Sequence, residues 1–410
     1  MSRRGAVVAG VALAIAVACG FGSGLAYDRW VVQHGLSPTE PADARDSFGV
    51  FWEAWRLVED QYVDRSVVTP VNLTHGAIGG MLDALGDTGH TRFLNASDRR
   101  AEENSLAGKL TGIGIEVESR DGRTVVVAPL DGSPAQRAGI ISGDVIEKIN
   151  DQDATKMSLD EVGRLIRGTQ GTSVKLTMLR PSLGQLLEFT IVREDVKVPD
   201  VTWSTIPGEK IIHIRISSFG QDSGTQLRAA ITQAKKDGDT GIVLDLRNDP
   251  GGLLDQAIRV SSEFLTSGDV LLEQDRSGKR EPDRVVSGGT APSDPLVVMV
   301  NHGTASAAEI VAGALQDQHR ATVIGEQTFG TGTVLKEFPL SDGSAILLGV
   351  REWLTPNGHS IRGSGITPDQ IVAQPATTRS LTPSGERSLT AEQVAASGDS
   401  QLLEAIKVLH

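Results

Sequence analysis

Cysteine is almost absent from this chain of 410 residues. The single one, Cys19, lies in an apolar N-terminal stretch, so an intramolecular disulfide and a cysteine-based metal site are excluded. Positive charge is also scarce, since 39 Lys and Arg stand against 52 Asp and Glu, for a net charge of -13. Phosphate backbones are bound by clustered cations, so nucleic acid is not expected as a partner. No metal-ligand cluster is visible, and we expect no metal and no cofactor.

The N-terminal residues begin with positive charge and continue with apolar side chains. Arg3 and Arg4 precede an apolar stretch at 5–26, which is the order of a secretory signal or a single membrane anchor. The length of this stretch matches the roughly 20 residues that span the hydrocarbon core of a membrane. We therefore expect an uncleaved anchor with both arginines on the cytoplasmic side. Cleavage after Ala26 and lipid attachment at Cys19 are the alternatives. Each of them places the rest of the chain outside the cytoplasm, on the cell membrane, in the periplasm or secreted.

The remaining chain divides into regions of different pattern. Its hydrophobic fraction of 39% is enough for a sizeable core and two or three domains. We expect a mixed α/β core with an inserted β-rich domain and a small N-terminal helical cap. The predicted boundaries, from the N-terminus, are an anchor at 1–26, a linker at 27–46, a helical cap at 47–105, a β-rich domain at 106–195, an α/β core at 196–374 and a flexible tail at 375–410.

Helical periodicity marks both ends of this exported part. In the cap, aromatic and apolar residues recur at three- and four-residue steps between Phe48 and Tyr62, which predicts a helix whose apolar face packs on the next element. The C-terminal segment is rich in Ser, Thr, Pro and Ala, which indicates a mobile tail. Within it, Leu402, Ile406 and Leu409 have helical spacing and predict a short terminal helix.

Residues 110–192 read as short strands around turns, with a short helix at 133–139 and a longer one at 159–167. The segments LTGIGI and SPAQRAGIISGDVIEKIN resemble a PDZ domain. The resemblance implies that a glycine-containing loop offers N–H groups to the C-terminal carboxylate of a peptide. The residues so assigned to peptide binding are Leu110, Thr111, Gly112, Ile113, Gly114 and Ile115.

The region 201–374 alternates β-rich runs with helices, which predicts a sheet covered by helices. Two polar loops follow apolar strands, at 247–252 after IVLDL and at 301–306 after LVVMV. Because ligand chemistry gathers at strand ends, we expect both loops to form the rim of one pocket.

The order of cap, PDZ-like insert and α/β core, together with several motifs, resembles the C-terminal processing (tail-specific) serine peptidases over residues 48–372. The motifs are LDLRNDPGG, TASAAEIVAGALQD, GEQTFGTG, LSDGS and LTPNGHSIRGSGITPD. The resemblance implies cleavage of polypeptides that have free C-termini and makes Ser306 the nucleophile. At a helix start, N–H groups and the helix dipole favour developing negative charge, so Ala307 and Gly251 or Gly252 are the expected oxyanion hole. A serine before a helix is otherwise a common N-cap.

The sequence departs from this family at the expected base. The lysine 25 residues after the serine and the glutamine four residues further are here Thr331 and Leu335. A threonine hydroxyl is no base at neutral pH, and leucine cannot hydrogen-bond an amine. Lys336 is near in sequence, but strand alternation directs it away from the face of residue 335.

Histidines supply other possible bases. His302 and His359 lie in loops of the core, where Glu352 or Asp249 could orient a rearranged triad. His90, in the turn GDTGHTRFL, is interpreted as structural or solvated rather than catalytic.

Two functions therefore remain open. One is a serine endopeptidase that uses the PDZ-like domain to capture tails and a base other than lysine. The other is a catalytically silent relative that binds exported polypeptides as a scaffold or adaptor. Ser306 and the glycines favour the first, whereas the loss of lysine and glutamine favours the second. A purely structural exported protein would leave two binding-type loops unexplained.

Overall fold

The computed structural model describes residues 44–410, except 88–89, 121, 131, 142, 158, 182 and 376–379. The predicted anchor at 5–26, with Cys19, lies outside the described residues. Among the residues described, no helix combines the length and apolar character needed to cross a membrane. The chain forms two compact units, Met1–Ile78 and Gly79–His410.

The N-terminal unit holds the predicted aromatic helix, α2 (Arg45–Gln61), and most of α3 (Pro70–Asp83). The rings of α2 contact one another, as in the pair of Phe51 and Trp52, whose centroids are 5.0 Å apart. The expectation that this face is buried on a neighbouring element is wrong, because Trp52 is 51% exposed and Tyr62 50% exposed. The stripe is therefore an apolar surface rather than core.

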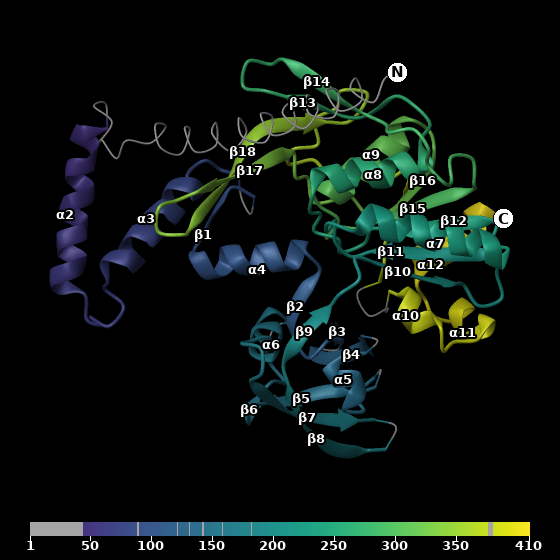
Figure 1. Ribbon diagram of the computed structural model, residues 1–410, viewed down its shortest axis with the longest axis horizontal. Coiled ribbons are helices and arrows are strands. Elements are labelled where there is room, and N and C mark those ends of the chain that lie inside the picture. The colour runs from purple at the N-terminus through teal and green to yellow at the C-terminus, as the bar shows by residue number, and fades with distance from the viewer. Residues whose placement is uncertain are drawn as a thin grey trace, which may run out of the picture. The chain divides into compact units, whose positions relative to one another are not determined.

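The second unit is built around the predicted α/β core (Figure 1). Its main sheet has the strand order β10-β11-β12-β15-β16-β19, in which β10 is antiparallel to β11 and the following strands are parallel. The central strands are buried along their whole length, as expected for parallel strands covered on both faces. The strands are β10 (Val201–Thr205), β11 (Ile211–Ile216), β12 (Gly241–Asp245), β15 (Leu296–Val300), β16 (Thr322–Gly325) and β19 (Gln370–Ile371).

Helices pack on both faces of this sheet. One face buries α7 (Ser223–Asp237), α8 (Leu254–Phe264) and α9 (Ala307–Asp317), which correspond to the helices predicted from periodicity. The other face buries residues of the C-terminal segment, among them Leu381, Val394, Leu402 and Ala405. The predicted flexible tail is therefore incorrect for most of its length. Its helices are α10 (Pro383–Glu386), α11 (Ala391–Ala395) and α12 (Ser400–Leu409).

A buried network of charges fastens the C-terminal segment to the sheet. The Arg247 guanidinium donates to Asp245 at the end of β12 and to Asp399 at the start of α12, and all three are fully buried. His213 on β11 contacts Glu386 of α10 at 2.7 Å and Asp245 at 3.2 Å. Burial alone would disfavour the imidazolium, but the two carboxylates raise the pKa of His213 to about 9.

A second sheet lies beside the core and forms part of the site described below. It has the order β1-β18-β13-β14, and β17 pairs with β18. The helix α4 (Ala96–Leu106) follows β1 and is capped by the Asn95 side chain. The strands are β1 (Arg92–Leu94), β13 (Asp269–Gln274), β14 (Arg280–Arg284), β17 (Thr333–Pro339) and β18 (Ala345–Leu354).

The inserted β-rich domain has its own sheet and core. The strand order is β3-β4-β5-β7-β8, with β6 beside β5, and a separate ribbon joins β2 to β9. Its core includes Ile113, Ile146, Leu176 and Met178. The elements are β2 (Lys109–Gly112), β3 (Ile115–Arg120), β4 (Arg123–Pro129), α5 (Pro134–Arg137), β5 (Val145–Ile149), β6 (Gln152–Asp153), α6 (Leu159–Ile166), β7 (Ser173–Arg180), β8 (Gln185–Val192) and β9 (Glu194–Lys197).

Candidate active site

The two loops predicted to share a rim are joined by hydrogen bonds. Asn301 Nδ2 donates to Asn248 Oδ1 at 2.9 Å, and Asn248 N donates to Asn301 Oδ1 at 2.8 Å. The buried Thr304 hydroxyl donates to the Leu246 carbonyl at 2.8 Å. The ends of β12 and β15 are neighbours because these strands are adjacent and parallel. The loop after β12 and the loop before α9 therefore form one rigid unit.

Ser306 has a strained backbone at the start of α9. Its φ is 54° and its ψ is -119°, whereas an N-cap serine normally has extended dihedrals. Such a conformation costs about 1–3 kcal/mol in a residue other than glycine, so the surrounding structure must impose it. A serine on a strained strand-to-helix turn is the geometry that exposes a nucleophilic hydroxyl in hydrolases. The backbone of Ser306 thus differs from that of an ordinary helix cap.

Gly251 lies directly against Ser306. A Cβ atom at position 251 would be 2.7 Å from Ser306 Cβ and 2.8 Å from Ala307 N, so only glycine fits there. The Gly251 N–H donates to Asp249 Oδ1 at 2.8 Å and is therefore engaged within its own loop. Among the described residues, neither Ala307 N nor Gly252 N has a hydrogen-bond acceptor. Of the predicted oxyanion donors, these two are open.

Glu309 connects the start of α9 to the loop on the opposite wall of the site, which carries Thr331. Its buried carboxylate accepts hydrogen bonds from Ser306 N at 3.0 Å, from Gly330 N and Thr331 N at 2.8 Å each, and from the Thr328 hydroxyl. Burial raises the pKa of Glu309, although these hydrogen bonds oppose the shift. The sequence interpretation gave Glu309 no role, but a glutamate three residues after a serine is the spacing of a capping box.

Ser306 faces a cavity of about 770 Å³. Its walls come from α4, from both glycine-containing loops and from β17 and β18, and they are mainly apolar. Apolar side chains among the lining residues are Leu106, Leu253, Leu254, Ile310, Phe329, Val334, Leu347 and Trp353. A peptide segment is thus the kind of ligand that this cavity accommodates.

The two residues that replace lysine and glutamine both line this cavity. Thr331 is buried and its hydroxyl has no hydrogen-bond partner, whereas Leu335 lies further along the same wall. The Lys336 ammonium lies 5.4 Å from the centre of the Phe338 ring, and Lys336 is not among the lining residues. Strand alternation predicted this direction for Lys336. Threonine and leucine therefore occupy the wall without a nearby amine.

The other bases considered from the sequence lie elsewhere. His302 is exposed, and the His359 side chain is 72% exposed with Asp317 at 3.9 Å. Glu352 accepts a hydrogen bond from Ser360 on the outer side of the second sheet. None of these three lines the cavity. Asp249 is buried, its Oδ1 accepts from Gly251 N, and burial raises its pKa well above the ordinary value.

His90 does line the cavity, although the sequence interpretation set it aside. Its Nδ1 is 3.4 Å from the Thr333 hydroxyl, and that hydroxyl is also 3.4 Å from Asp87 Oδ2. The turn that carries His90 is adjacent in sequence to β1, which pairs with β18 of the same wall. The contact joins residues 243 positions apart, so no local signal could have revealed it.

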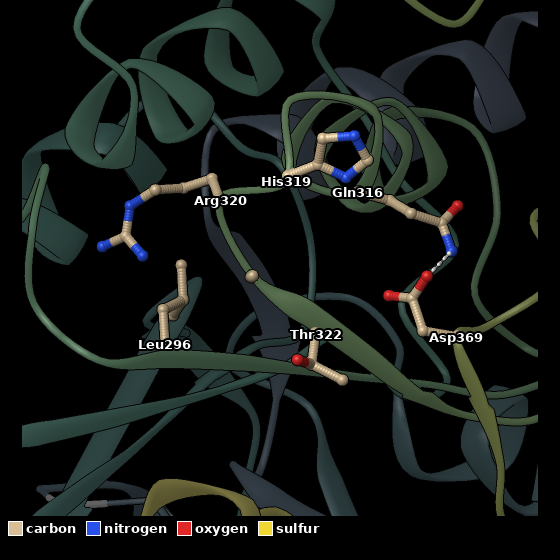
Figure 2. A pocket seen from close by; sticks show the side chains of 7 residues that line it. Leu296, Gln316, His319, Arg320, Thr322 and Asp369 are labelled. Carbon is tan, nitrogen blue, oxygen red and sulfur yellow. Dashed lines mark hydrogen bonds between the residues drawn. The ribbon is translucent and has the colours of Figure 1, made fainter.

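A second, smaller hollow of about 330 Å³ lies at the C-terminal end of α9 (Figure 2). Gln316 there donates to Asp369 Oδ1 at 3.0 Å. The Arg320 guanidinium is bound by the carbonyls of Phe264, Ala291 and Asp294. The Gln316 amide and the Arg320 guanidinium are thus already paired within the protein.

The residues assigned to peptide binding lie at the entry to the edge strand of the inserted domain. Leu110, Thr111 and Gly112 belong to β2, which pairs with β9. Ile113 is buried in the core of the domain, and Gly114 has a φ of 71°. Ile115 begins β3, which pairs only with β4 in the described part of the chain. The segment therefore leads into an open sheet edge.

Three or more potential metal ligands do not come together anywhere in the described ranges. The groups at the cavity include hydroxyls, the His90 imidazole and the paired charges of Arg92, Glu102 and Glu337, beside open backbone N–H groups.

Comparison with known proteins identifies this architecture. Residues 210–372 match peptidase family S41, and residues 125–180 match the PDZ domain. A carboxy-terminal-processing protease of Bartonella bacilliformis is 38% identical over 333 residues, which are 79% of this chain and 75% of that protein. The chain belongs to peptidase family S41. As a member, it is a C-terminal processing serine-type peptidase with a PDZ domain, as the motifs predicted.

Other members give the same result. A carboxy-terminal processing protease of Bacillus subtilis is 36% identical over 328 residues, which are 78% of this chain and 68% of that protein. Among solved structures, a photosystem II D1 C-terminal processing protease superposes with a TM-score of 0.51 at 32% identity, covering 82% of this chain and 96% of that one. The S41 match includes Ser306 and Thr331, whereas the PDZ match begins after residues 110–115.

Proposed function

We propose that this S41 member is an extracytoplasmic endopeptidase in which Ser306 attacks the peptide carbonyl. The observation that supports this most strongly is the strained turn of Ser306, beside Gly251 and open to the large cavity. The N-terminus of α9 favours the negative charge that forms on the carbonyl oxygen. The Ala307 and Gly252 N–H groups serve as the oxyanion hole, and Gly251 permits the close approach of the two loops.

The test compares the full-length chain with Ser306→Ala on an unfolded protein that has an apolar C-terminal tail. The wild type cleaves it, and the variant falls to the background rate, because Ser306 carries the one hydroxyl of the described lining that stands at the start of α9. Absence of cleavage by the wild type at every pH tried would remove the peptidase proposal. Equal cleavage by both proteins would instead remove Ser306 as the nucleophile.

We propose further that Thr331 stands where the usual lysine base would act. The buried Thr331 hydroxyl has no hydrogen-bond partner among the described residues, so its replacement sacrifices no hydrogen bond to them. The double variant Thr331→Lys, Leu335→Gln should cleave at least about tenfold faster at alkaline pH, where the amine is neutral. An unchanged rate in a folded variant would show that this part of the wall does not reach the reacting atoms.

The PDZ domain is proposed to capture the C-terminal tails of exported proteins. The open edge of β3 can accept a peptide as an added strand, and the backbone of residues 110–115 lies at its entry. Gly114 is required there, since a Cβ atom would be 2.5 Å from Ser133 Cβ. A peptide with a free apolar C-terminus should bind more tightly than its amidated form. Equal affinities would contradict a carboxylate site in this segment.

A silent scaffold is the second candidate, and the residues Thr331 and Leu335 favour it. A scaffold would bind tails as described but leave the unfolded protein intact in the presence of the wild type. Binding without cleavage is therefore the result that selects this candidate.

The proposed location rests on the sequence order of Arg3, Arg4 and the apolar stretch 5–26. An external protease added to intact spheroplasts should degrade the chain if the catalytic part is outside the membrane. Protection until the cells are lysed would place it inside.

A further inference from the structure

The geometry points to His90 as the residue that accepts the proton of Ser306, with Asp87 and Thr333 as positioning residues. This inference rests on the proposed nucleophile. It assigns the general base, which the replacement of the usual lysine by Thr331 leaves unassigned. His90 and Ser306 line the same cavity, and His90 is the single imidazole among the described residues of that lining.

The other polar residues of the lining cannot replace it. Thr331 and Thr333 carry hydroxyls, which are not bases near neutral pH. Arg92 is a permanent cation and is paired with Glu102 at 2.9 Å. Glu337 and Glu103 are both paired with Arg99, at 2.9 Å and 3.3 Å. His90 alone offers a neutral nitrogen with a pKa in the range that general bases use.

A chain of contacts behind His90 selects the useful tautomer. Asp87 Oδ2 accepts from the Thr91 hydroxyl at 2.6 Å, and it is the acceptor for the Thr333 hydroxyl at 3.4 Å. The Thr333 oxygen then presents a lone pair to His90 Nδ1, also at 3.4 Å. The proton is therefore held on Nδ1, and Nε2 keeps the lone pair that a base needs. Contacts of this length are common in a site without substrate and shorten when substrate binds.

Burial favours the neutral form of His90 before substrate binds. Burial lowers the pKa of His90 below the ordinary value, the charge of Asp87 opposes this shift, and the charge of Arg92 adds to it. Arg362 lies 3.6 Å from the other oxygen of Asp87 and weakens the effect of that carboxylate. A neutral imidazole at pH 7 can take up a proton.

In the reaction, the O–H bond of Ser306 breaks as its oxygen bonds to the substrate carbonyl carbon. The proton moves to His90 Nε2, directly or through one bridging water. The C–N bond of the peptide then breaks, and the imidazolium returns this proton to the leaving amine. Water releases the acyl group by the same steps, so that Ser306 and His90 end as they began.

The test measures how fast a fluorophosphonate phosphonylates Ser306, by intact mass, in the full-length chain. This probe forms an O–P bond at an activated serine and releases fluoride, so it reports on the base even if no peptide is cut. His90→Gln should lower the labelling rate by about 100-fold or more. The wild-type rate should rise with pH and level off at an apparent pKa below the ordinary histidine value, and this step should be missing in the variant.

Matched variants separate the base from folding. His410→Gln removes an exposed imidazole that contacts Glu209 at 3.0 Å, and it should label as the wild type does. Thr333→Val removes the hydroxyl between Asp87 and His90 and should slow labelling by about 10- to 100-fold through misorientation of the ring. This variant provides the test if His90→Gln does not fold. Ser306→Ala should not be labelled.

Two outcomes would overturn the inference. One is an equal labelling rate and pH profile in wild type and His90→Gln, with Thr333→Val also unchanged. The other is a wild type that is not labelled at all, which would show that Ser306 has no base. Labelling that depends on His90, without cleavage of any polypeptide, would support His90 and contradict the proposed peptidase function. Cleavage that depends on Ser306 but not on His90 would support the proposed peptidase function and contradict His90 as the base.

Discussion

Two buried acidic centres lie on opposite faces of the core sheet, and their charges are balanced differently. Glu309, on the face covered by α9, is surrounded by backbone N–H groups and one hydroxyl. Asp245, on the face covered by the C-terminal segment, is surrounded by Arg247, His213 and Arg215. Burial dominates at the first and raises the pKa of Glu309. At the second, the charges and hydrogen bonds of Arg247, His213 and Arg215 together outweigh burial and lower the pKa of Asp245.

The difference separates two tasks. Hydrogen bonds from backbone N–H groups to Glu309 fix the path of the loop that carries Thr331. Because these donors are dipoles, no cation is brought to the cavity. Full charges fix distant segments to each other, so Asp245 and Arg247 join β12 to α12. We therefore expect substitutions at the ionic centre to affect stability most, and substitutions around Glu309 to affect the cavity more than the fold.

The largest expected effect is that of Arg247→Met. It leaves Asp245 and Asp399 buried without their shared cation, which should lower the free energy of unfolding by about 3–5 kcal/mol. Chemical denaturation measures the change. Arg259→Met is the control, because the Arg259 side chain is 65% exposed, and its effect should stay within about 0.5 kcal/mol. A loss below about 1 kcal/mol for Arg247→Met would break the contrast between the two centres.

The second effect is a pH dependence of stability. Because the pKa of His213 is raised to about 9 from 6.5, its contribution is complete below pH 6.5 and is lost as the pH rises through 9. The free energy of unfolding should fall by up to about 3 kcal/mol over this interval. His213→Asn, though less stable, should lack this slope. Parallel pH profiles for the two proteins would show that His213 is neutral in the fold.

A smaller effect is expected for Glu309→Gln. The amide keeps the volume of the side chain but directs N–H groups at existing donors, which should cost about 1–3 kcal/mol. Fluorophosphonate labelling of Ser306 should also slow, since the backbone of Ser306 loses its partner. Glu404→Gln on the surface of α12 serves as the control. A larger loss than for Arg247→Met would reverse the proposed division of tasks.

The smallest effect on stability concerns the backbone strain at Ser306, whose N–H donates a hydrogen bond to Glu309. Glycine tolerates a φ of 54°, so Ser306→Gly should be more stable than Ser306→Ala by about 1 kcal/mol. Neither variant has the hydroxyl, so the comparison isolates the backbone. At Ser261, inside α8, the order should be opposite, with alanine more stable than glycine by about 1 kcal/mol. The same order at both positions would indicate that Ser306 is not strained.

Much of the core was predictable because its signals are local. The helices α7, α8 and α9 follow from the alternation of β-rich runs with helices, and the strands β12 and β15 from short runs that are mostly apolar. The loops after these strands lie together because parallel neighbouring strands end at the same edge of the sheet. The family motifs lie on these same segments.

Other features depend on contacts between distant residues. The composition of the C-terminal segment resembles disorder, but Asp399 reaches Arg247 across 152 positions and Leu402 completes the core. His90 gains its role only from Thr333 and the cavity. The aromatic stripe of α2 has the period of a buried face, yet periodicity does not show which element, if any, covers it.

The salt bridge between Arg247 and Asp399 also sets the order in which the molecule can assemble. Strand β12 leads into the loop that positions Gly251 against Ser306, but its buried arginine is neutralised by residues made about 150 positions later. Until those residues emerge from the ribosome, Arg247 and Asp245 must stay in water and the second face of the sheet must stay open. A nascent chain therefore reaches position 306 well before the loop beside it can take its final form, which delays the assembly of the site around the proposed nucleophile.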